Sequence, residues 1–533
     1  KGLMPKLKRL IDEGASGLLT TTIPPVSASA WVSMATGTNP GQHGMIDFTY
    51  PQPDGYRIEV SNGTTWQAPP LWSRIGKAGG KMGVISLPMT YPPRPLNGYI
   101  LCTFLAPSED SEYTYPPDLK REIEAAVGHF PLQMDEGARG RDRGLFTRAV
   151  TEMEIQRSRV VCYLLDTQPW DFFIYVLETT DNLQHEIWHV IDPNHPRHDP
   201  EEAKRVLPAI EEYYRTVDEQ VGAMLGRIPD EALVIVMSDH GFGPFHRFFH
   251  VNNWLMREGY LAIKRDPLSL AKLALYKLGF TPLNVLHLLT AVGLSRLRKR
   301  VKRGRSQGLL RKVFLSFRDV DWARTKAFAV GNFGQVYLNV KGQRPHGVIE
   351  PGDEYEATRD EIIEAALALR DPDSGDRVVK AAYRREEIFR GNAAERTPDI
   401  VLHTDRARYV SFGHADFGSN RVVEDSFGQT GHHHMDGIIV LHGPGVRRGE
   451  RLEGARIIDV APTILWAMGL PVPRYMDGEV LLGAFEPEVA AGRPVDFSSE
   501  PSPSGPGDLD GDVYSAEEED AVIERLRDLG YVS

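Results

Sequence analysis

Three clusters of aspartate and histidine are the residues of this chain whose types and spacing could do chemistry. Asp181 lies four residues before His185, Asp239 is followed directly by His240, and a run of three histidines lies at 432–434. Carboxylate and imidazole groups are the ligands that zinc uses in hydrolytic sites, and two ions can share such a site. Because each cluster adjoins an apolar run typical of a buried strand, the sequence predicts a two-metal hydrolytic site assembled from several strand ends.

Each cluster also has an interpretation without a metal. Asp181 could cap a helix while His185 faces solvent, although a helix that begins there would place both side chains on one face. Asp239 could simply form a turn with Gly241. The position of the histidines at 432–434 selects none of the three as a ligand, so that choice stays open at this point.

Ser27 is the candidate nucleophile. It follows two prolines and opens a stretch, 28–35, that predicts a helix. Serine at such a position is most often a helix cap. The same geometry would place its hydroxyl and free backbone N–H groups at a helix N-terminus, which binds anions, and a metal bound to the hydroxyl would favour the alkoxide. Ser29 and Ser33 remain alternatives that spacing does not exclude.

The elements that must position these residues alternate between apolar runs and helical stretches. Continuous apolar strands alternating with helices indicate an α/β fold with a doubly wound, mostly parallel sheet. Ligands of such sheets gather at the carboxyl ends of the strands, where Asp181, Asp239 and His240 fall. The strands are expected at 81–87, 172–177, 232–237 and 437–441, and the helices at 6–13, 28–35, 71–78, 211–225 and 460–468.

The alternation of strands and helices along the chain predicts a core that is interrupted by a capping insertion. The insertion breaks the alternation with an apolar helical stretch, 268–297, and a hairpin around the loop 331–334. The last segment ends in a charged helix, where Ser515 and Glu518 form a capping box. In chain order, the expected units are the first part of the core at 1–254, the capping insertion at 255–400, the second part of the core at 401–485, and a linker with the C-terminal helix at 486–533.

Composition and charge limit the classes of partner. The chain has 533 residues and a net charge of −12, which argues against general nucleic-acid binding. Two cysteines, Cys102 and Cys162, cannot form a disulfide framework, which favours a reducing, cytoplasmic setting. The segment 268–312 combines an apolar stretch with a basic run and could contact a membrane peripherally, although such runs are more often a solvated face. The sequence leaves the oligomeric state open.

Taken together, these segments resemble the alkaline phosphatase superfamily, in particular its type I phosphodiesterase/nucleotide pyrophosphatase branch. His433, which lies four residues before Gly437, matches the family's late metal-binding histidine, and Ser27 matches its nucleophile. The order and spacing of the motifs, over roughly residues 3–485, carry the resemblance more than any single motif does. The matching segments are 23–48, 180–185, 238–243, 459–463 and 476–478.

The resemblance implies a two-metal phosphoester hydrolase, with zinc expected and manganese or iron as alternatives. Ser27 would attack phosphorus in line and form a phosphoserine intermediate, which water would then release. The substrate would be a small phosphoester, and a diester fits the branch better than a monoester. Two alternatives remain: a phosphomutase or phosphotransferase of the same superfamily, and a non-catalytic binding protein that retains the fold. One ion would be held by Asp181, His185 and His433, and the other by Asp239, His240 and the Oγ atom of Ser27.

Two departures from the family pattern shape what we expect of the site. The family takes a further metal-ligating Asp from the end of its first strand, which would precede Lys1, so we expect that an upstream strand completes the second metal site. The family also places an Asn shortly after its nucleophile, whereas this chain has no amide side chain at 28–30. We therefore expect Asn332 or Gln335, in the capping insertion, to contact the phosphate.

Overall fold

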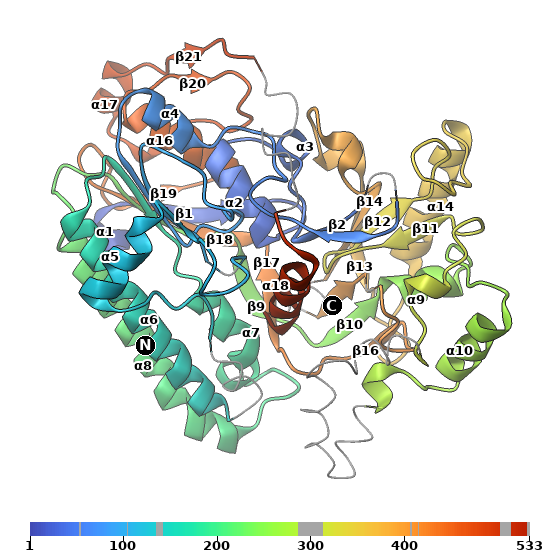
Figure 1. The fold of residues 1–533 in the computed structure, drawn as a ribbon. Helices are drawn as coiled ribbons and strands as arrows, with labels where there is room; N and C mark the ends of the chain where they lie inside the picture. The colour runs from blue at the N-terminus through green and yellow to red at the C-terminus, as the bar shows by residue number, and fades with distance from the viewer. Residues whose placement is uncertain are drawn as a thin grey trace.

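The computed structural model describes residues 1–52, 55–103, 105–134, 142–285, 313–405, 408–413, 415–501 and 513–529. Its core holds two four-stranded sheets with helices on both sides (Figure 1). In spatial order, the first sheet consists of β19 (Glu450–Leu452), β1 (Ala15–Thr20), β18 (Asp436–His442) and β8 (Val234–Met237). The second consists of β6 (Thr114–Tyr115), β5 (Gly98–Leu101), β4 (Met82–Ile85) and β7 (Phe172–Tyr175).

The α/β fold class is confirmed, and the sheets combine parallel and antiparallel strands. β4 runs parallel to both β5 and β7. β18 instead runs antiparallel to β1 and to β8. The expected strand at 437–441 therefore forms, but its first residue lies at the sheet edge where β8 ends. Residues that precede β18 consequently reach the same edge as residues that follow β8.

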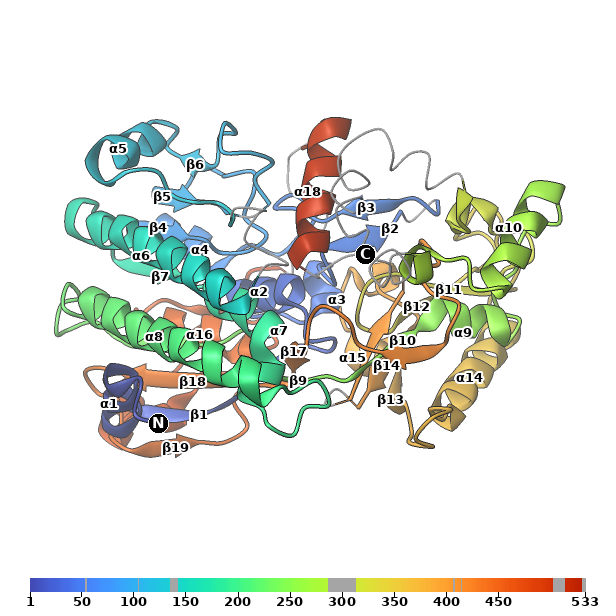
Figure 2. The same ribbon diagram turned by 90° about the horizontal axis from the view of Figure 1, so that it is seen from below.

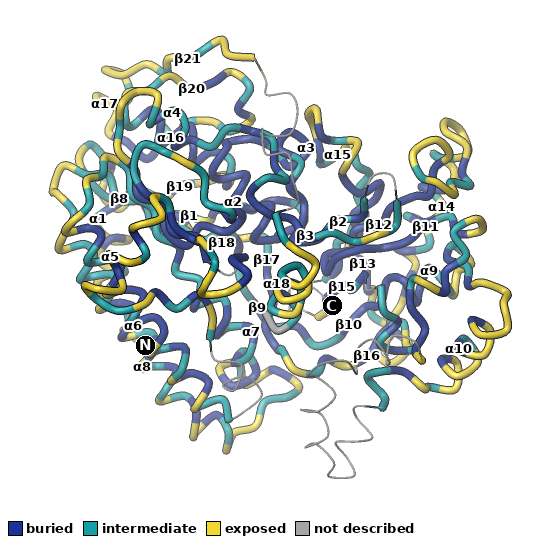
Figure 3. The backbone as a smooth tube through the Cα atoms, viewed as in Figure 1, coloured by how far each residue is buried: buried dark blue, intermediate teal, exposed yellow. Residues whose placement is uncertain are grey.

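The sheets are covered by the expected helices and by a further long helix at 143–167. The long helices α6 (Arg143–Thr167) and α8 (Pro200–Leu225) pack side by side (Figure 2), and α1 (Pro5–Glu13) packs on α8. On the other side, α2 (Ser27–Thr36) contacts α4 (Leu71–Lys77) and α16 (Val460–Ala467). Every residue of α2 is buried, as the dark tube in Figure 3 shows. Its many Ser and Ala side chains occupy little volume, which lets this helix lie deep between its neighbours.

A second lobe has a hydrophobic cluster of its own. The expected hairpin forms from β11 (Ala327–Ala329) and β12 (Gln335–Leu338), which pair antiparallel. Next to β12 lie β14 (Ile400–Thr404) and β13 (Val379–Arg384). The helices α9 (Val251–Arg257) and α14 (Asp353–Ala368) contact this sheet, on the right in Figure 1. A three-stranded sheet of β15 (Tyr409–Phe412), β10 (Arg247–His250) and β16 (Val423–Asp425) borders the lobe.

Part of the expected apolar and basic segment lies outside the described residues. α10 (Pro267–Lys277) forms within the stretch 268–297, whereas 286–312, which includes the basic run, is not among the described residues. The peripheral membrane contact through 268–312 therefore stays a prediction. None of the helices in the described ranges is long and apolar enough to cross a membrane.

The C-terminal helix α18 (Ala516–Leu529) forms as expected. Its capping box is complete, because Ser515 Oγ accepts a hydrogen bond from Glu518 N at 3.3 Å and Glu518 Oε2 accepts one from Ser515 N at 2.8 Å. The interaction satisfies two backbone donors at the helix start.

Asp47 joins the core to the capping insertion. Its carboxylate is buried and accepts hydrogen bonds from Phe48 N at 2.7 Å and from Gln335 Nε2 of β12 at 3.0 Å. Burial raises the pKa of Asp47 from 3.8 to about 7, although these donors and the backbone of Asn332 act in the opposite direction. Gln335, expected from the sequence to contact phosphate, thus has its amide group engaged with the core.

We predict that Asp47 makes the protein less stable as the pH rises from about 4 to about 7. In this window the unfolded chain has lost the Asp47 proton, since its carboxyl has the ordinary pKa of 3.8, while the folded chain keeps it until about pH 7. At about 1.4 kcal/mol per pH unit, the loss approaches 4 kcal/mol. Urea unfolding at pH 5 and 7.5 should show a smaller difference for Asp47→Asn than for the parent. The exposed Asp230→Asn is the matched control and should show the same difference as the parent. If the free energy of unfolding of Asp47→Asn changes with pH as much as that of the parent, the prediction is wrong.

Candidate metal centre

Asp181 and His185 come from the first two turns of α7 (Thr179–Ile191). The predicted helix start is confirmed to within two residues, and the spacing of four places both side chains on one helix face. Asp181 lies inside the helix, because the N-cap position belongs to Glu178. His433 lies on β17 (Gly431–His434), which pairs antiparallel with β9 (Gly241–Pro244) directly after the Asp239–His240 cluster.

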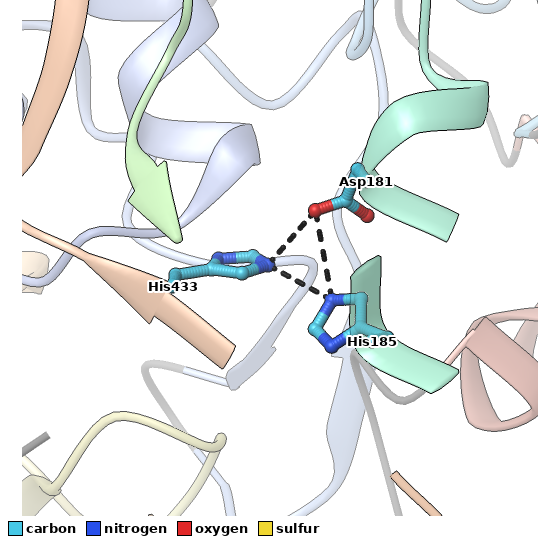
Figure 4. Close-up of side chains that lie close together, drawn as sticks. All are labelled: Asp181, His185 and His433. Atoms are coloured by element: carbon cyan, nitrogen blue, oxygen red, sulfur yellow. Dashed lines mark hydrogen bonds and ion pairs between the residues drawn. The ribbon is translucent and has the colours of Figure 1, made fainter. Parts of the chain in front are cut away.

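The ligand atoms of Asp181, His185 and His433 all lie within 4.8 Å of one another (Figure 4). The two Nε2 atoms of His185 and His433 are 3.1 Å apart. The Oδ1 atom of Asp181 lies 3.3 Å from Nε2 of His433 and 3.6 Å from Nε2 of His185. The three residues point toward one common position from a helix and a strand that are far apart in the sequence.

Backbone carbonyl groups fix which nitrogen of each ring carries the proton. Nδ1 of His185 lies 2.9 Å from the carbonyl oxygen of Gly431, and Nδ1 of His433 lies 3.0 Å from that of Pro25. A carbonyl oxygen only accepts hydrogen bonds, so Nδ1 is the donor in both rings and each Nε2 holds a lone pair. This backbone support is typical of histidines that bind a metal.

The pKa values make this donor set fit a divalent cation. Burial lowers the pKa of both imidazoles, that of His433 to about 3, so both rings are neutral at pH 7. Burial alone would raise the pKa of Asp181, but the neighbouring His185, His433 and His240 hold it well below its usual range. Two lone pairs and a carboxylate that face one another repel, and a cation between them removes the repulsion. Two nitrogens and one oxygen suit zinc.

Ser27, Asp239 and His240 form a second group beside the first. Ser27 Oγ lies 3.0 Å from Nε2 of His240, whose Nδ1 lies 2.9 Å from the carbonyl oxygen of Gly241. Nε2 of His240 is also 3.4 Å from Oδ2 of Asp239 and 3.9 Å from Oδ1 of Asp181. Burial raises the pKa of Asp239, and His240 opposes this shift. The hydroxyl of Ser27, the Nε2 atom of His240 and the carboxylate of Asp239 therefore lie together. Asp181 of the first group is close to the same nitrogen.

Within the described part of the chain, only the first group brings three His or carboxylate ligands together closely enough to hold one ion. The second group offers Asp239 and His240 together with the hydroxyl of Ser27. The structure thus brings together all six residues that the sequence singled out for catalysis and metal binding. Asn332 and Gln335 lie in the adjacent insertion loop and on β12, and their contact with substrate stays a prediction.

The contacts of each ring distinguish the three histidines of the run. All three lie on β17, and the ring centroid of His432 is 5.5 Å from that of His185. His433 stacks on His240 with ring centroids 3.6 Å apart, whereas Nδ1 of His432 accepts a hydrogen bond from the His433 backbone N at 2.8 Å. Only His433 therefore belongs to the ligand group.

Sequence reasoning missed the groups that support the ligands. The carbonyl oxygens of Pro25, Gly431 and Gly241 orient the three imidazoles, and a carbonyl role leaves no signal in residue type. Phe333 of the insertion loop also packs its ring against His433, with centroids 5.6 Å apart. A hairpin loop gives no hint of this contact, because loops usually lie at the surface, whereas Phe333 is buried.

A cavity of about 1150 Å³ opens on these residues. Ser27, Asp181, Asp239 and His240 line it, and so do the strands β7 and β8 along their whole length. Among the described strands, β7 pairs only with β4 and β8 only with β18, so each presents one open edge. Both strands are apolar yet only half-buried. The cavity therefore includes a slot between two open strand edges that leads to the metal centre.

We predict that His433→Ala weakens zinc binding at least about 100-fold, because it removes a direct ligand and even supporting residues contribute 10- to 100-fold. As a control, His442→Ala at the other end of β18 should change the affinity little, because His442 pairs with Glu13 of α1 and not with the candidate ligands. Calorimetric titration of metal-free protein with Zn²⁺ measures the difference, and circular dichroism checks that both variants fold. Equal weakening in the two variants would show that His433 is not a ligand.

Comparisons with known proteins agree with this geometry. The family model described as type I phosphodiesterase/nucleotide pyrophosphatase matches residues 1–433. No curated protein matches the sequence significantly.

Solved structures with a similar fold include phosphonoacetate hydrolase from Sinorhizobium meliloti 1021 in complex with phosphonoacetate. It is 16% identical, with a TM-score of 0.49 over 86% of this chain and 89% of that one. Human ectonucleotide pyrophosphatase/phosphodiesterase 5 is 12% identical, with a TM-score of 0.44 over 88% of this chain and 90% of that one. An inactive variant of the murine protein, in complex with AMP, gives the same values. Because the family model spans most of the sequence, the chain belongs to the type I phosphodiesterase/nucleotide pyrophosphatase family, whose members hydrolyse phosphoesters.

Proposed function

We propose that this chain is a phosphodiesterase that acts through a phosphoserine intermediate on Ser27 with two divalent ions, most simply zinc. The observation that carries the proposal is the position of Ser27 Oγ, 3.0 Å from Nε2 of His240 and inside the Asp and His cluster. Zinc is favoured over manganese or iron because the first group offers two imidazole nitrogens and one carboxylate oxygen.

The place of Ser27 in α2 supports its role. The N-cap position belongs to Val26, so Ser27 is the first residue inside the helix and its hydroxyl does not cap it. The backbone N–H groups of the first helical turn have no partner within the helix and point toward the same end. A helix N-terminus of this kind binds anions, here the non-bridging oxygens of a phosphoester.

The residues then divide the reaction between them. Bound divalent ions would supply positive charge for the phosphoryl oxygens and favour the deprotonated hydroxyl of Ser27. The Oγ atom of Ser27 forms a bond to phosphorus while the bond to the leaving-group oxygen breaks on the opposite side, and that oxygen takes up a proton. Water later attacks the phosphoserine and restores the hydroxyl. Transfer to another acceptor would instead make the protein a phosphotransferase.

The setting proposed for this reaction is a reducing one. Both cysteines are free thiols, Cys102 buried and Cys162 half-buried, which supports the cytoplasmic location expected from the sequence. Small phosphoesters are the proposed substrates, since the chain belongs to a family of nucleotide pyrophosphatases and phosphodiesterases.

We predict that Ser27→Ala lowers kcat for bis(p-nitrophenyl) phosphate by at least about 1000-fold, because it removes the nucleophile. The buried Ser29, two residues further along α2, provides the control, since its Oγ makes no hydrogen bond within the described structure. Ser29→Ala should stay within about threefold of the parent, because no interaction is lost. Normal cleavage by Ser27→Ala would exclude this residue as nucleophile, and absence of cleavage by the parent would favour the binding-protein alternative.

A second proposal concerns the ligand that the second ion still requires. We propose that an additional strand seats in the slot between β7 and β8 and delivers a carboxylate beside Asp239 and His240, as the family resemblance implies. The support is physical: a parallel strand there would pair the backbone groups of both open edges and end at the metal centre. Met4 and Leu7 line the same cavity, so the chain before α1 lies close to the slot.

The number of bound ions tests this second proposal. Residues 1–533 should bind one Zn²⁺ tightly, at Asp181, His185 and His433, and a form extended at its N-terminus by a strand that ends in an aspartate should bind two. Metal content measured by mass spectrometry after dialysis distinguishes the two results. An equal count in both forms would rule out the strand as the source of the missing ligand.

A further inference from the structure

The C-terminal helix α18 forms a wall of the cavity that opens on the metal centre. One face of the helix packs Val522 and Leu526, both fully buried, into the main hydrophobic core. The other face lines the cavity with Ala521, Glu524 and Arg525, which lie at helical spacing. Since Ser27 and Asp181 line the same cavity, α18 and these residues border one continuous space.

α18 lies between the two lobes. It contacts β3 (Ile58–Val60), the strand that pairs with β2 (Thr49–Pro51), and both ribbon views place it beside this hairpin (Figures 1 and 2). An ion pair at 2.7 Å joins Glu519 of the helix to Arg57, just before β3. Arg57 is largely exposed, so this pair orients the helix more than it stabilises it.

The C-terminal segment also holds a loop at the carboxyl end of β5. Tyr514 Oη donates a hydrogen bond to the carbonyl oxygen of Leu105 at 3.0 Å. The guanidinium of Arg525 donates to the next two carbonyl oxygens, those of Ala106 and of Pro107, the latter at 2.8 Å. Two side chains thus satisfy three successive carbonyl groups.

The conformation of this loop therefore depends on α18. Leu105 and Ala106 are buried, and buried carbonyl groups without a partner are costly. Pro107 lines the cavity together with Ser27. Loss of the C-terminal partners would let the loop rearrange, and the rearrangement would change the space in front of the nucleophile.

We propose that α18 is a fixed wall of the substrate cavity and that Arg525 is a positioning residue, which holds the loop 105–107 against the space for the substituent on phosphorus. The wall limits the size of that substituent, so the enzyme selects compact phosphodiesters. The kinetic part of this inference rests on the proposed phosphodiesterase activity, whereas the structural part, the dependence of the loop on α18, does not.

The first experiment removes the wall. A variant that ends at Pro501 should exchange the backbone hydrogens of 102–107 faster than the parent. Its kcat/KM for the bulky substrate thymidine 5′-(p-nitrophenyl phosphate) should rise about 10-fold relative to its kcat/KM for the compact substrate methyl p-nitrophenyl phosphate. A factor of this size is typical of the discrimination that contacts in a binding pocket provide. A synthetic peptide of residues 513–533 should restore both properties. A general loss of stability would instead lower both kcat/KM values together.

The second experiment removes only the hydrogen bonds that Arg525 donates to the loop 105–107. Arg525→Ala should speed exchange at 102–107 and shift the substrate ratio in the same direction as the truncation. Arg525→Lys should resemble it, because a single ammonium cannot reproduce the planar fork that bonds two carbonyl groups. Asp520→Ala, on the exposed face of the same helix, is the matched control and should behave like the parent.

The two arms separate failure of this inference from failure of the proposed function. If hydrogen exchange at 102–107 is unchanged in both the truncated protein and Arg525→Ala, then α18 does not fix this loop and Arg525 does not hold it, whatever the activity. Faster exchange without a change in the substrate ratio would overturn the role in selectivity. If the parent cleaves no phosphodiester, exchange alone decides the structural claim and the proposed function is the part that fails.

Discussion

The mutual repulsion of three ligand groups is the constraint on which the rest of the site depends. The Nε2 atoms of His185 and His433 lie 3.1 Å apart and face the carboxylate of Asp181, all of them buried or nearly so. Such an arrangement persists only where the surrounding structure holds each ring in place, and the backbone does so through carbonyl groups that accept from each Nδ1. A bound cation would relieve the same repulsion, so the backbone contacts that hold these three groups together would also favour the binding of a metal.

The direction of a single strand brings these groups together. β18 runs antiparallel to its neighbours, so the residues before it reach the sheet edge where β8 ends. His433 arrives from that side, on β17, while Asp239 and His240 arrive at the end of β8. If β18 ran parallel, residues near its start would lie at the opposite edge. The order of ligands along the chain therefore follows from the topology of the sheet.

The sequence could predict the fold class, most core elements and six candidate site residues that the structure brings close together, and the reasons are local. Apolar runs such as 172–177 and 232–237 form strands because burial leaves them few alternatives, and the spacing of Asp181 and His185 matches one helical turn. The parts that could not be predicted depend on contacts between distant segments. The antiparallel direction of β18, the carbonyl group of Pro25 that orients His433, and the burial of Phe333 against that ring are all tertiary in origin.

The chemistry and the selectivity of this site belong to different parts of the chain. The ligands and Ser27 lie at strand ends and helix starts of the core, where packing leaves little freedom, and α2 is buried throughout. Neighbouring groups come from elsewhere: Phe333 of the insertion lobe packs on the ring of His433, and Arg525 of the C-terminal helix lines the cavity. If the proposed function holds, a change in these surrounding groups would alter the space around phosphorus without moving a metal ligand, so that one set of ligands could serve substrates of different size. Under the proposed function, substrate preference should therefore be sought in α18 and the loop 105–107, not among the candidate metal ligands.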